Sequence, residues 1–263
     1  MPRFRRVVWT CCLLLPLIVA AAAPASVHGG TDPAVPDSAL ERVERLRADG
    51  QFDEALGALQ TLRKRHGEHV SLLWRASLTQ VDLGKVVREK EKAQPHYKKA
   101  NALADSALSV DSTNAPAHLA KAVAEGRLAL DAGTKERVRR SRKIKEHADR
   151  AIELDSTLAG AFHVRGRWNR EVSDLNFFER TIVKTVYGGL PESSFDQAVE
   201  DFKAAISLED VRFHHLELAK TYLKMDREAE AREQLNIVLE LPKKEYFGDR
   251  HLEEAKALLD EIG

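Results

Sequence analysis

Two pairs of basic residues occur at one-turn spacing in the second half of the chain, and this spacing suits the binding of carboxylates. Arg167 and Arg170 lie three positions apart and Lys220 and Lys224 lie four apart, so each pair shares one face of a helix. A guanidinium group donates charge-assisted hydrogen bonds to carboxylates. The pattern therefore favours an extended peptide or an acidic helix as ligand.

These residues belong to a larger set that we expect on the concave face of a helical array. An apolar floor with basic groups along it also suits a phospholipid, with the cations at the headgroup. The alternative is that the aromatic residues near Arg167 are simply core and the arginines a solvated face. The expected binding residues are Trp74, Arg75, Leu119, His163, Arg167, Arg170, Leu216, Lys220 and Lys224.

A second candidate surface is the segment at residues 171–192, which has more apolar residues than an exposed loop should display. Its aromatic residues are Phe177, Phe178 and Tyr187. We expect a short extra helix that packs against the groove or the neighbouring repeat. The alternative is a contact with a membrane or a partner, because an uncovered apolar patch is otherwise a liability.

Cations are concentrated at residues 135–145, where seven Lys and Arg residues accompany one acid, Glu136. On a helix they spread over more than one face, which favours a solvated helix; contact with anionic lipid or an acidic partner is the alternative. No aromatic residue interleaves with them, and the chain's 41 basic residues are balanced by 41 acidic ones. We therefore expect no nucleic-acid partner.

No set of side chains has the spacing typical of catalysis or metal binding. The 10 histidines are scattered, and His66 and His69 have a glycine between them that interrupts a helical turn. The Gly-x-Ser-x-Gly sequence of a nucleophile elbow is missing. We expect a protein that is not an enzyme and that has no metal site and no cofactor.

The N-terminus has the layout of a signal peptide. Three arginines precede an almost uncharged run at residues 7–23, and small residues place the expected cleavage after Ala25. The run is shorter than the ~20 apolar residues of a spanning helix. This favours export, to a periplasm or outside the cell, over anchoring by an uncleaved segment. Cys11 and Cys12 both lie within it, so the mature chain would have no thiol.

A recurring phrase marks helix ends at residues 107–112, 151–156 and 205–210, where Ala-Ile or Ala-Leu leads to an acidic residue and a turn. Before it, small and large residues follow each other at steps of three and four, as in Phe195, Ala198, Phe202 and Ala205. Such steps form one stripe on a helix, with small residues where two helices approach closely. The pattern is similar to the tetratricopeptide repeat, a pair of helices of about 34 residues.

These stripes predict an all-α fold, a tetratricopeptide-like α-α superhelix. It would be a right-handed solenoid of about five helix pairs with a C-terminal capping helix. We expect one domain at residues 38–263, after a signal peptide at 1–25 and a flexible linker at 26–37. The expected helices lie at residues 38–48 and 52–65, 70–83 with a second helix to 110, 116–131 and 135–154, 158–175 and 194–208, 213–224 and 229–241, and 249–262.

Several segments of the inserts are more distinctive than the repeats. They are residues 145–155, Gly166-Arg167-Trp168, Phe178-Glu179-Arg180 and residues 187–195, together with 72–76. These segments resemble the regulator of microtubule dynamics family over residues 70–245. The resemblance implies a non-enzymatic helical-repeat domain whose eukaryotic relatives associate with microtubules, mitochondria and endoplasmic reticulum, with a lipid-binding role proposed for one branch. The signal peptide points to an exported, bacterial-type member.

These observations predict a scaffold or adaptor that binds a protein or peptide partner on its concave face. The alternative is a lipid- or small-molecule-binding carrier in which the segment at 171–192 closes an apolar groove. Membrane association, if any, would be peripheral.

Overall fold

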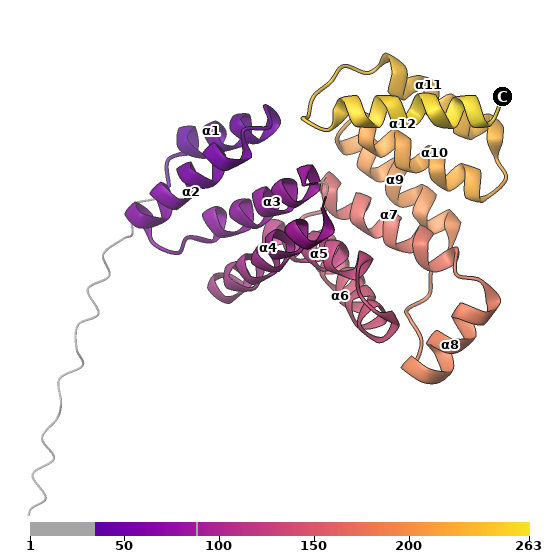
Figure 1. Ribbon diagram of the computed structural model, residues 1–263, viewed down its shortest axis with the longest axis horizontal. Coiled ribbons are helices and arrows are strands. Elements are labelled where there is room, and N and C mark those ends of the chain that lie inside the picture. The colour runs from indigo at the N-terminus through magenta and orange to yellow at the C-terminus, as the bar shows by residue number, and fades with distance from the viewer. Residues whose placement is uncertain (1–34, 88) are drawn as a thin grey trace, which may run out of the picture. The chain divides into compact units, whose positions relative to one another are not determined.

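Helices make up most of the part of the chain that the computed structural model describes, residues 35–87 and 89–263 (Figure 1). The expected signal peptide, and the linker up to residue 34, lie outside the described residues. No helix within the described ranges is long and apolar enough to span a bilayer. The helices are α1 (Asp37–Ala48), α2 (Phe52–His66), α3 (Val70–Val86), α4 (Lys90–Val110), α5 (Ala115–Leu130), α6 (Thr134–Leu154), α7 (Ala159–Ser173), α8 (Phe177–Tyr187), α9 (Phe195–Leu208), α10 (Arg212–Lys224), α11 (Glu228–Glu240) and α12 (Gly248–Glu261).

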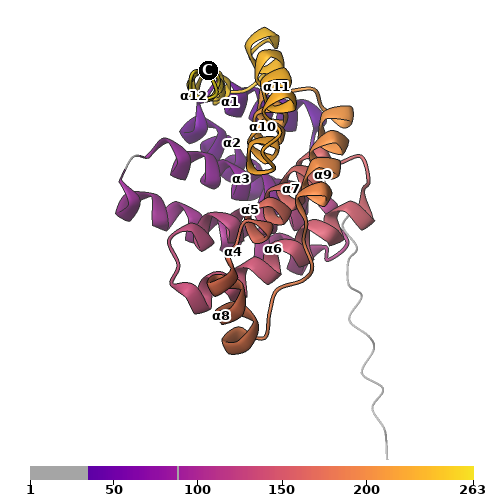
Figure 2. The ribbon, with the colours of Figure 1, turned by 90° about the vertical axis from the view of Figure 1, so that its right-hand side faces the viewer.

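Successive helices pack as five pairs: α1 with α2, α3 with α4, α5 with α6, α7 with α9, and α10 with α11. Helix α12 covers the last pair by packing on both α10 and α11 (Figure 2). Helix α8 is inserted between the two members of the fourth pair. The prediction of an all-α, tetratricopeptide-like array of five pairs and a cap is confirmed, with most expected helix ends within two residues of those found.

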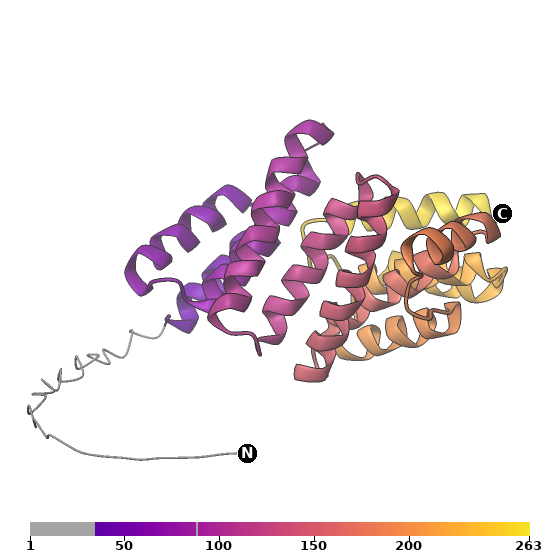
Figure 3. The ribbon, with the colours of Figure 1, turned by 90° about the horizontal axis from the view of Figure 1, so that it is seen from below.

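The pairs are arranged in two layers. The first helices of successive pairs contact one another, α3 with α5, α5 with α7, α7 with α10, and α10 in turn with α12. We call the surface that these helices share the first-helix face; it is the face expected to be concave. The second helices form the other layer, and each also contacts the first helix of the next pair. Helix α4, for example, contacts α5, which in turn packs on α6 (Figure 3).

The recurring phrase ends α4 and α6 in the same way. Asp111 and Asp155 follow these helices, and each accepts a hydrogen bond from the backbone N–H two residues on, at Thr113 and Thr157, both at 2.9 Å. The threonine hydroxyls donate to the same carboxylate oxygens. Such local bonds offer the backbone an alternative to helix, which is why the chain turns there.

Small residues let the helices of a pair approach closely. A Cβ added to Gly84 of α3 would lie 2.3 Å from the ring of Tyr97 in α4. One added to Gly166 of α7 would lie 3.1 Å from the ring of Phe202, a fully buried residue of α9. The close crossings are therefore set by glycine and alanine on one helix and a large ring on the other.

The loop between α11 and α12 packs against the first pair. The Phe52 ring lies edge-on to Tyr246 at 5.2 Å and stacks on Phe247 at 6.0 Å. Tyr246 sits directly over Gly50, where φ is +78° and a Cβ would lie 2.2 Å from the tyrosine ring. Val35, which falls in the expected linker two residues before α1, is also buried in the core of the first pair. The two ends of the array are thus tied by aromatic contacts.

The close approach at Gly84 yields a stability prediction. Gly84→Ala should lower the free energy of unfolding by about 1–3 kcal/mol, because the new methyl overpacks a filled site against Tyr97. Gly57→Ala is the matched control: it also lies within a helix, but a Cβ there meets nothing within 4 Å. The control should gain roughly 0.5–1 kcal/mol from helix propensity. Denaturant unfolding measures both; a stabilised Gly84→Ala would contradict the packing argument.

Candidate functional site

A buried ion pair joins α7 to α10 on the first-helix face. Arg170 donates to the carboxylate of Glu217 at 2.7 Å and to the backbone carbonyl of Glu217 at 3.1 Å, with side chains 8% and 6% exposed. Lys220 lies 3.0 Å and Arg167 3.4 Å from the same carboxylate. Burial alone would raise the pKa of Glu217, but these three cations lower it well below its usual range. Glu217 therefore stays ionised in the folded protein.

A second cluster of charges links α1 to α3. Asp82 accepts from Arg47 at 2.8 Å and from Lys85 at 3.0 Å. Glu44 accepts from Arg47 and from Arg75, both at 2.8 Å. Each carboxylate thus serves two cations, so the cluster is fully paired.

Arg127 of α5 lies between these clusters and has no such partner. Within the described residues it makes neither an ion pair nor a hydrogen bond. Burial lowers the pKa of Arg127, and the nearby cations Arg167 and Arg250 lower it further. Lys85, whose pKa is also lowered by burial and in part by Arg127, faces it from α3. Four cations from α3, α5, α7 and α12 therefore lie near one another, with the Asp82 carboxylate also close to Arg127.

Aromatic rings flank this group of cations. Lys85 lies over the ring of Phe247 at 4.6 Å and Arg250 over the same ring at 5.7 Å. The loop that ties the two ends of the array therefore also supplies a ring to the cationic centre. Such contacts position the cations. Lys85 and Arg167 are also paired with Asp82 and Glu217, whereas Arg127 makes no ion pair among the described residues.

The structure divides the expected binding residues into three groups. Arg167, Arg170 and Lys220 come together around Glu217, as described above. Arg75 is turned toward Glu44 of α1 and stacks on Trp74 at 4.0 Å. Lys224 is half exposed and pairs with Asp174 at 2.7 Å, at the end of α7.

The apolar members of the set do not line an open groove. Leu216 is fully buried in the core formed with α11 and α12, so its expected placement on an accessible face is wrong. His163 is likewise buried. Leu119 fills the contact of α5 with Gly160 at the start of α7, and Trp74 packs on the core of α3 to α5. These residues hold the helices together beneath the charges.

Sequence reasoning missed Lys85, Arg127, Glu217 and Arg250. The sequence does contain a pattern that points to Arg127. Leu119, Val123 and Arg127 follow each other at steps of four, so Arg127 lies one turn beyond the residues that we expected on the binding face. No sequence pattern points to Glu217, because its pairing with Arg170 depends on how α10 crosses α7.

Histidine pairs occur at two helix contacts, and the first pair is buried. His163 and His214 share a hydrogen bond between their Nδ1 atoms at 2.8 Å. Neither Nε2 atom has a hydrogen-bond partner, although that of His214 lies 4.0 Å from the Glu209 carboxylate. Burial lowers the pKa of His214 to about 4 and that of His163 well below its ordinary value. Both rings are therefore neutral at pH 7, one donating and one accepting.

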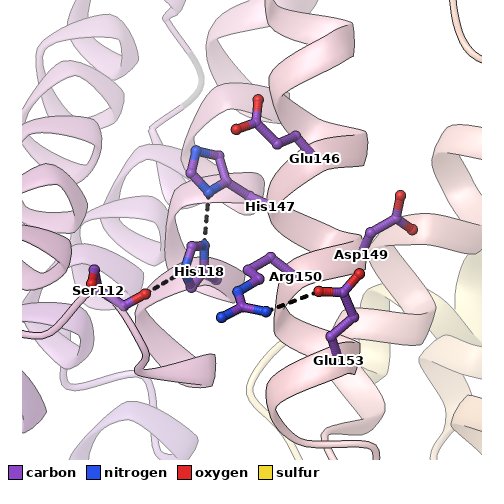
Figure 4. A pocket seen from close by; sticks show the side chains of 7 residues that line it. All are labelled: Ser112, His118, Glu146, His147, Asp149, Arg150 and Glu153. Atoms are coloured by element: carbon purple, nitrogen blue, oxygen red, sulfur yellow. Dashed lines mark hydrogen bonds and ion pairs between the residues drawn. The ribbon is translucent and has the colours of Figure 1, made fainter.

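The other pair, His118 of α5 and His147 of α6, lies in a surface depression (Figure 4). His118 donates from Nε2 to the Ser112 carbonyl at 3.0 Å, so its Nδ1 accepts from Nδ1 of His147 at 2.9 Å. Arg150 and Glu153 beside it pair with each other. No group of three or more His, Cys, Asp or Glu side chains in the described part of the chain is arranged to hold a metal ion.

Paired helices that cross at small residues, with charges gathered on the first-helix face, define a tetratricopeptide-like helical repeat protein. The fold is similar to the crystal structure of a thermophilic TPR protein from Thermus thermophilus, with a TM-score of 0.61 and 21% identity, covering 85% of this chain and 98% of that one. The family model for regulator of microtubule dynamics protein 1-3 matches residues 39–263. The chain therefore belongs to the regulator of microtubule dynamics family.

Relatives in this family match the chain over part of their own length. Regulator of microtubule dynamics protein 3 of Rattus norvegicus is 26% identical over 207 residues, which are 77% of this chain and 44% of the relative. Protein 1 of Bos taurus is 29% identical over 194 residues, 72% of this chain and 60% of the relative. The chain thus spans about half the length of the relatives that it matches.

The histidine pair between α7 and α10 makes stability depend on pH. The unfolded chain takes up protons at these histidines near pH 6.5, whereas folded His214 stays neutral down to about pH 4. The unfolded state binds more protons in this window, so the free energy of unfolding should fall as the pH is lowered from 7 to 4.5, by about 2 kcal/mol for His214 alone.

Denaturant unfolding across this pH range measures the effect. Replacing both residues together, His163→Leu with His214→Leu, removes the titrating groups without leaving one ring unpaired, and the pH slope should become shallower. An unchanged slope in the double variant would show that other groups cause the acid sensitivity.

Proposed function

We propose that this protein is a non-enzymatic scaffold that binds an acidic segment of a protein partner on its first-helix face. The observation that carries the proposal is Arg127, a partly buried cation that makes no ion pair or hydrogen bond among the described residues. Lys85, Arg167 and Arg250 lie near it, and the nearby acid, Asp82, is already paired with Arg47 and Lys85. An uncompensated buried charge is costly to the folded state. A ligand carboxylate at this point would remove that cost.

The neighbouring clusters favour a segment of chain over a single anion. Glu217 and Asp82 are already saturated by cations from the protein, so a ligand carboxylate has its place between them, at Arg127. The exposed part of Arg167 and the cation Arg250 extend the positive surface along the layer to α12. A partner with several Asp or Glu residues in one extended or helical segment matches this arrangement.

The alternative, a lipid or small-molecule carrier closed by the segment at 171–192, has less support. Helix α8 of that segment packs on α6, in the second layer, among the described helices. Its phenylalanines are turned outward. A lid over the first-helix face would have to contact α5, α7 or α10 instead.

Export of the chain after cleavage at residue 25 is part of the proposal and rests on the sequence alone. An intact mass that retained residues 1–25 would contradict it and would favour an anchor. Membrane anchoring and peptide binding are compatible, because the first-helix face lies within residues 35–263.

The test is Arg127→Met measured against a Glu-rich peptide, with a Lys-rich peptide of equal length as probe control. We expect the wild-type protein to bind the Glu-rich peptide and the variant to bind it about tenfold more weakly or worse. The free energy of unfolding should stay the same or rise by up to about 1 kcal/mol, since the change removes a buried unpaired cation.

Arg65→Met, on the exposed side of α2, is the matched control and should leave peptide binding unchanged. Raised salt should weaken binding of the wild type. Equal binding by wild type and Arg127→Met, or a preference for the Lys-rich peptide, would refute the proposed site.

A further inference from the structure

Helix α8 carries an uncovered apolar face. Phe177 and Phe178 are 77% and 76% exposed, Val186 is 64% exposed and Ile182 48%. Phe178, Ile182 and Val186 follow each other at steps of four and form one stripe, with Phe177 beside its first turn. Large apolar side chains gathered in this way on one helix mark a contact surface.

This face is held outward by a well-fixed helix. Asn176 caps α8 by accepting from the Glu179 backbone N–H at 3.0 Å, and Glu179 accepts from the Asn176 backbone N–H at 3.0 Å. At the other end Gly188, with φ at +76°, stops the helix, and Arg142 of α6 donates to the carbonyls of Tyr187 and Gly189. Val183 is the buried residue of α8 and turns toward the array. The exposure therefore follows from how α8 is docked (Figure 1).

Cations lie on α8 and near one end of its apolar face. Arg180 and Lys184 lie on α8 itself, and both are exposed. Lys135 and Arg139 of α6 line one shallow depression together with Val186 and Tyr187. The acids nearby are engaged, Glu179 in the helix cap and Glu136 with Arg139 at 2.5 Å. The surface thus combines exposed phenylalanines with a surplus of positive charge.

We propose that α8 is a docking helix for an anionic lipid surface, with Phe177, Phe178 and Ile182 inserted at the level of the acyl chains. Lys184, Arg180 and Lys135 would then lie at the level of the lipid phosphates. A helix with an apolar face and flanking Lys and Arg lies in the membrane interface in this way, and its binding grows with buried apolar area and with the anionic charge of the lipids.

Charge decides between a lipid surface and a second copy of the chain. A two-fold contact would place the same patch on both sides, so Lys135, Arg180 and Lys184 of one copy would face those of the other. Like charges across a contact are unfavourable. Anionic headgroups complement the patch instead.

This inference concerns a surface separate from the proposed peptide site. Helix α8 docks on α6 of the second layer, whereas Arg127 belongs to the first-helix face. A failure of lipid binding would therefore not contradict the proposed peptide site, and a failure of peptide binding would not contradict the proposed lipid contact.

Co-sedimentation with vesicles tests the proposal on the mature chain. We expect binding to vesicles of phosphatidylcholine with phosphatidylserine, and weak or no binding to phosphatidylcholine alone. Phe177→Ser with Phe178→Ser should reduce binding about tenfold or more while leaving the unfolding midpoint unchanged, because both rings are exposed in the folded protein. Lys135→Glu with Lys184→Glu should reduce it as well, and so should raised salt.

Val110→Ser is the matched control, because Val110 is 52% exposed at the end of α4, a helix that does not pack on α8, and its loss should leave vesicle binding unchanged. Phe178→Trp supplies a direct readout, since insertion shifts tryptophan emission to the blue on addition of anionic vesicles only. The proposal is overturned if the wild type ignores phosphatidylserine, or if the double phenylalanine variant binds as well as the wild type. A concentration-dependent dimer that this variant abolishes, without vesicle binding, would assign the face to self-association.

Discussion

Close contact between neighbouring helices is the constraint on which the rest of this structure depends. A pair of amphipathic helices cannot bury its apolar stripe alone, so each pair needs the next one. The contact distance is set by small residues: Ala100, Ala104 and Ala107 in α4 and Ala198 and Ala205 in α9 are fully buried. Because the helices lie this close, long polar side chains of adjacent first helices reach one another across the layer.

That reach explains the distribution of charge on the first-helix face. Arg170 spans from α7 to the carboxylate of Glu217 on α10, and Arg47 spans from α1 to Asp82 on α3. In both clusters every buried carboxylate is met by two or more cations, as the low dielectric of a packed layer requires. Arg127 is an exception among the cations of this face, because it has no carboxylate paired with it among the described residues. The same packing that satisfies its neighbours leaves this guanidinium with other cations around it.

The repeats made the helices predictable, and the crossings between them were not. A phrase that ends in Asp-Ser-Thr stops α4 and α6 through a side chain two residues from the helix, so the signal is local and visible in the sequence. The buried state of Leu216 depends on α12, which closes over α10 from far along the chain. The spacing of residues within α10 alone predicted Leu216 on an open face, because that spacing contains no information about α12.

Helix α8 was predicted as a short extra helix from the apolar residues of its segment, and its packing on α6 of the preceding pair is one of the two placements that this prediction left open. The loops on either side of α8 carry it out of the fourth pair, and α7 and α9 still pack on each other as the other pairs do. In return the array gains one buried side chain, Val183, worth about 2 kcal/mol. Four large apolar side chains stay in water on the other side of the same helix. Folding of the array accounts for the five pairs and the cap, but it does not account for the exposed apolar face of α8, which is why we assign that face to a lipid surface.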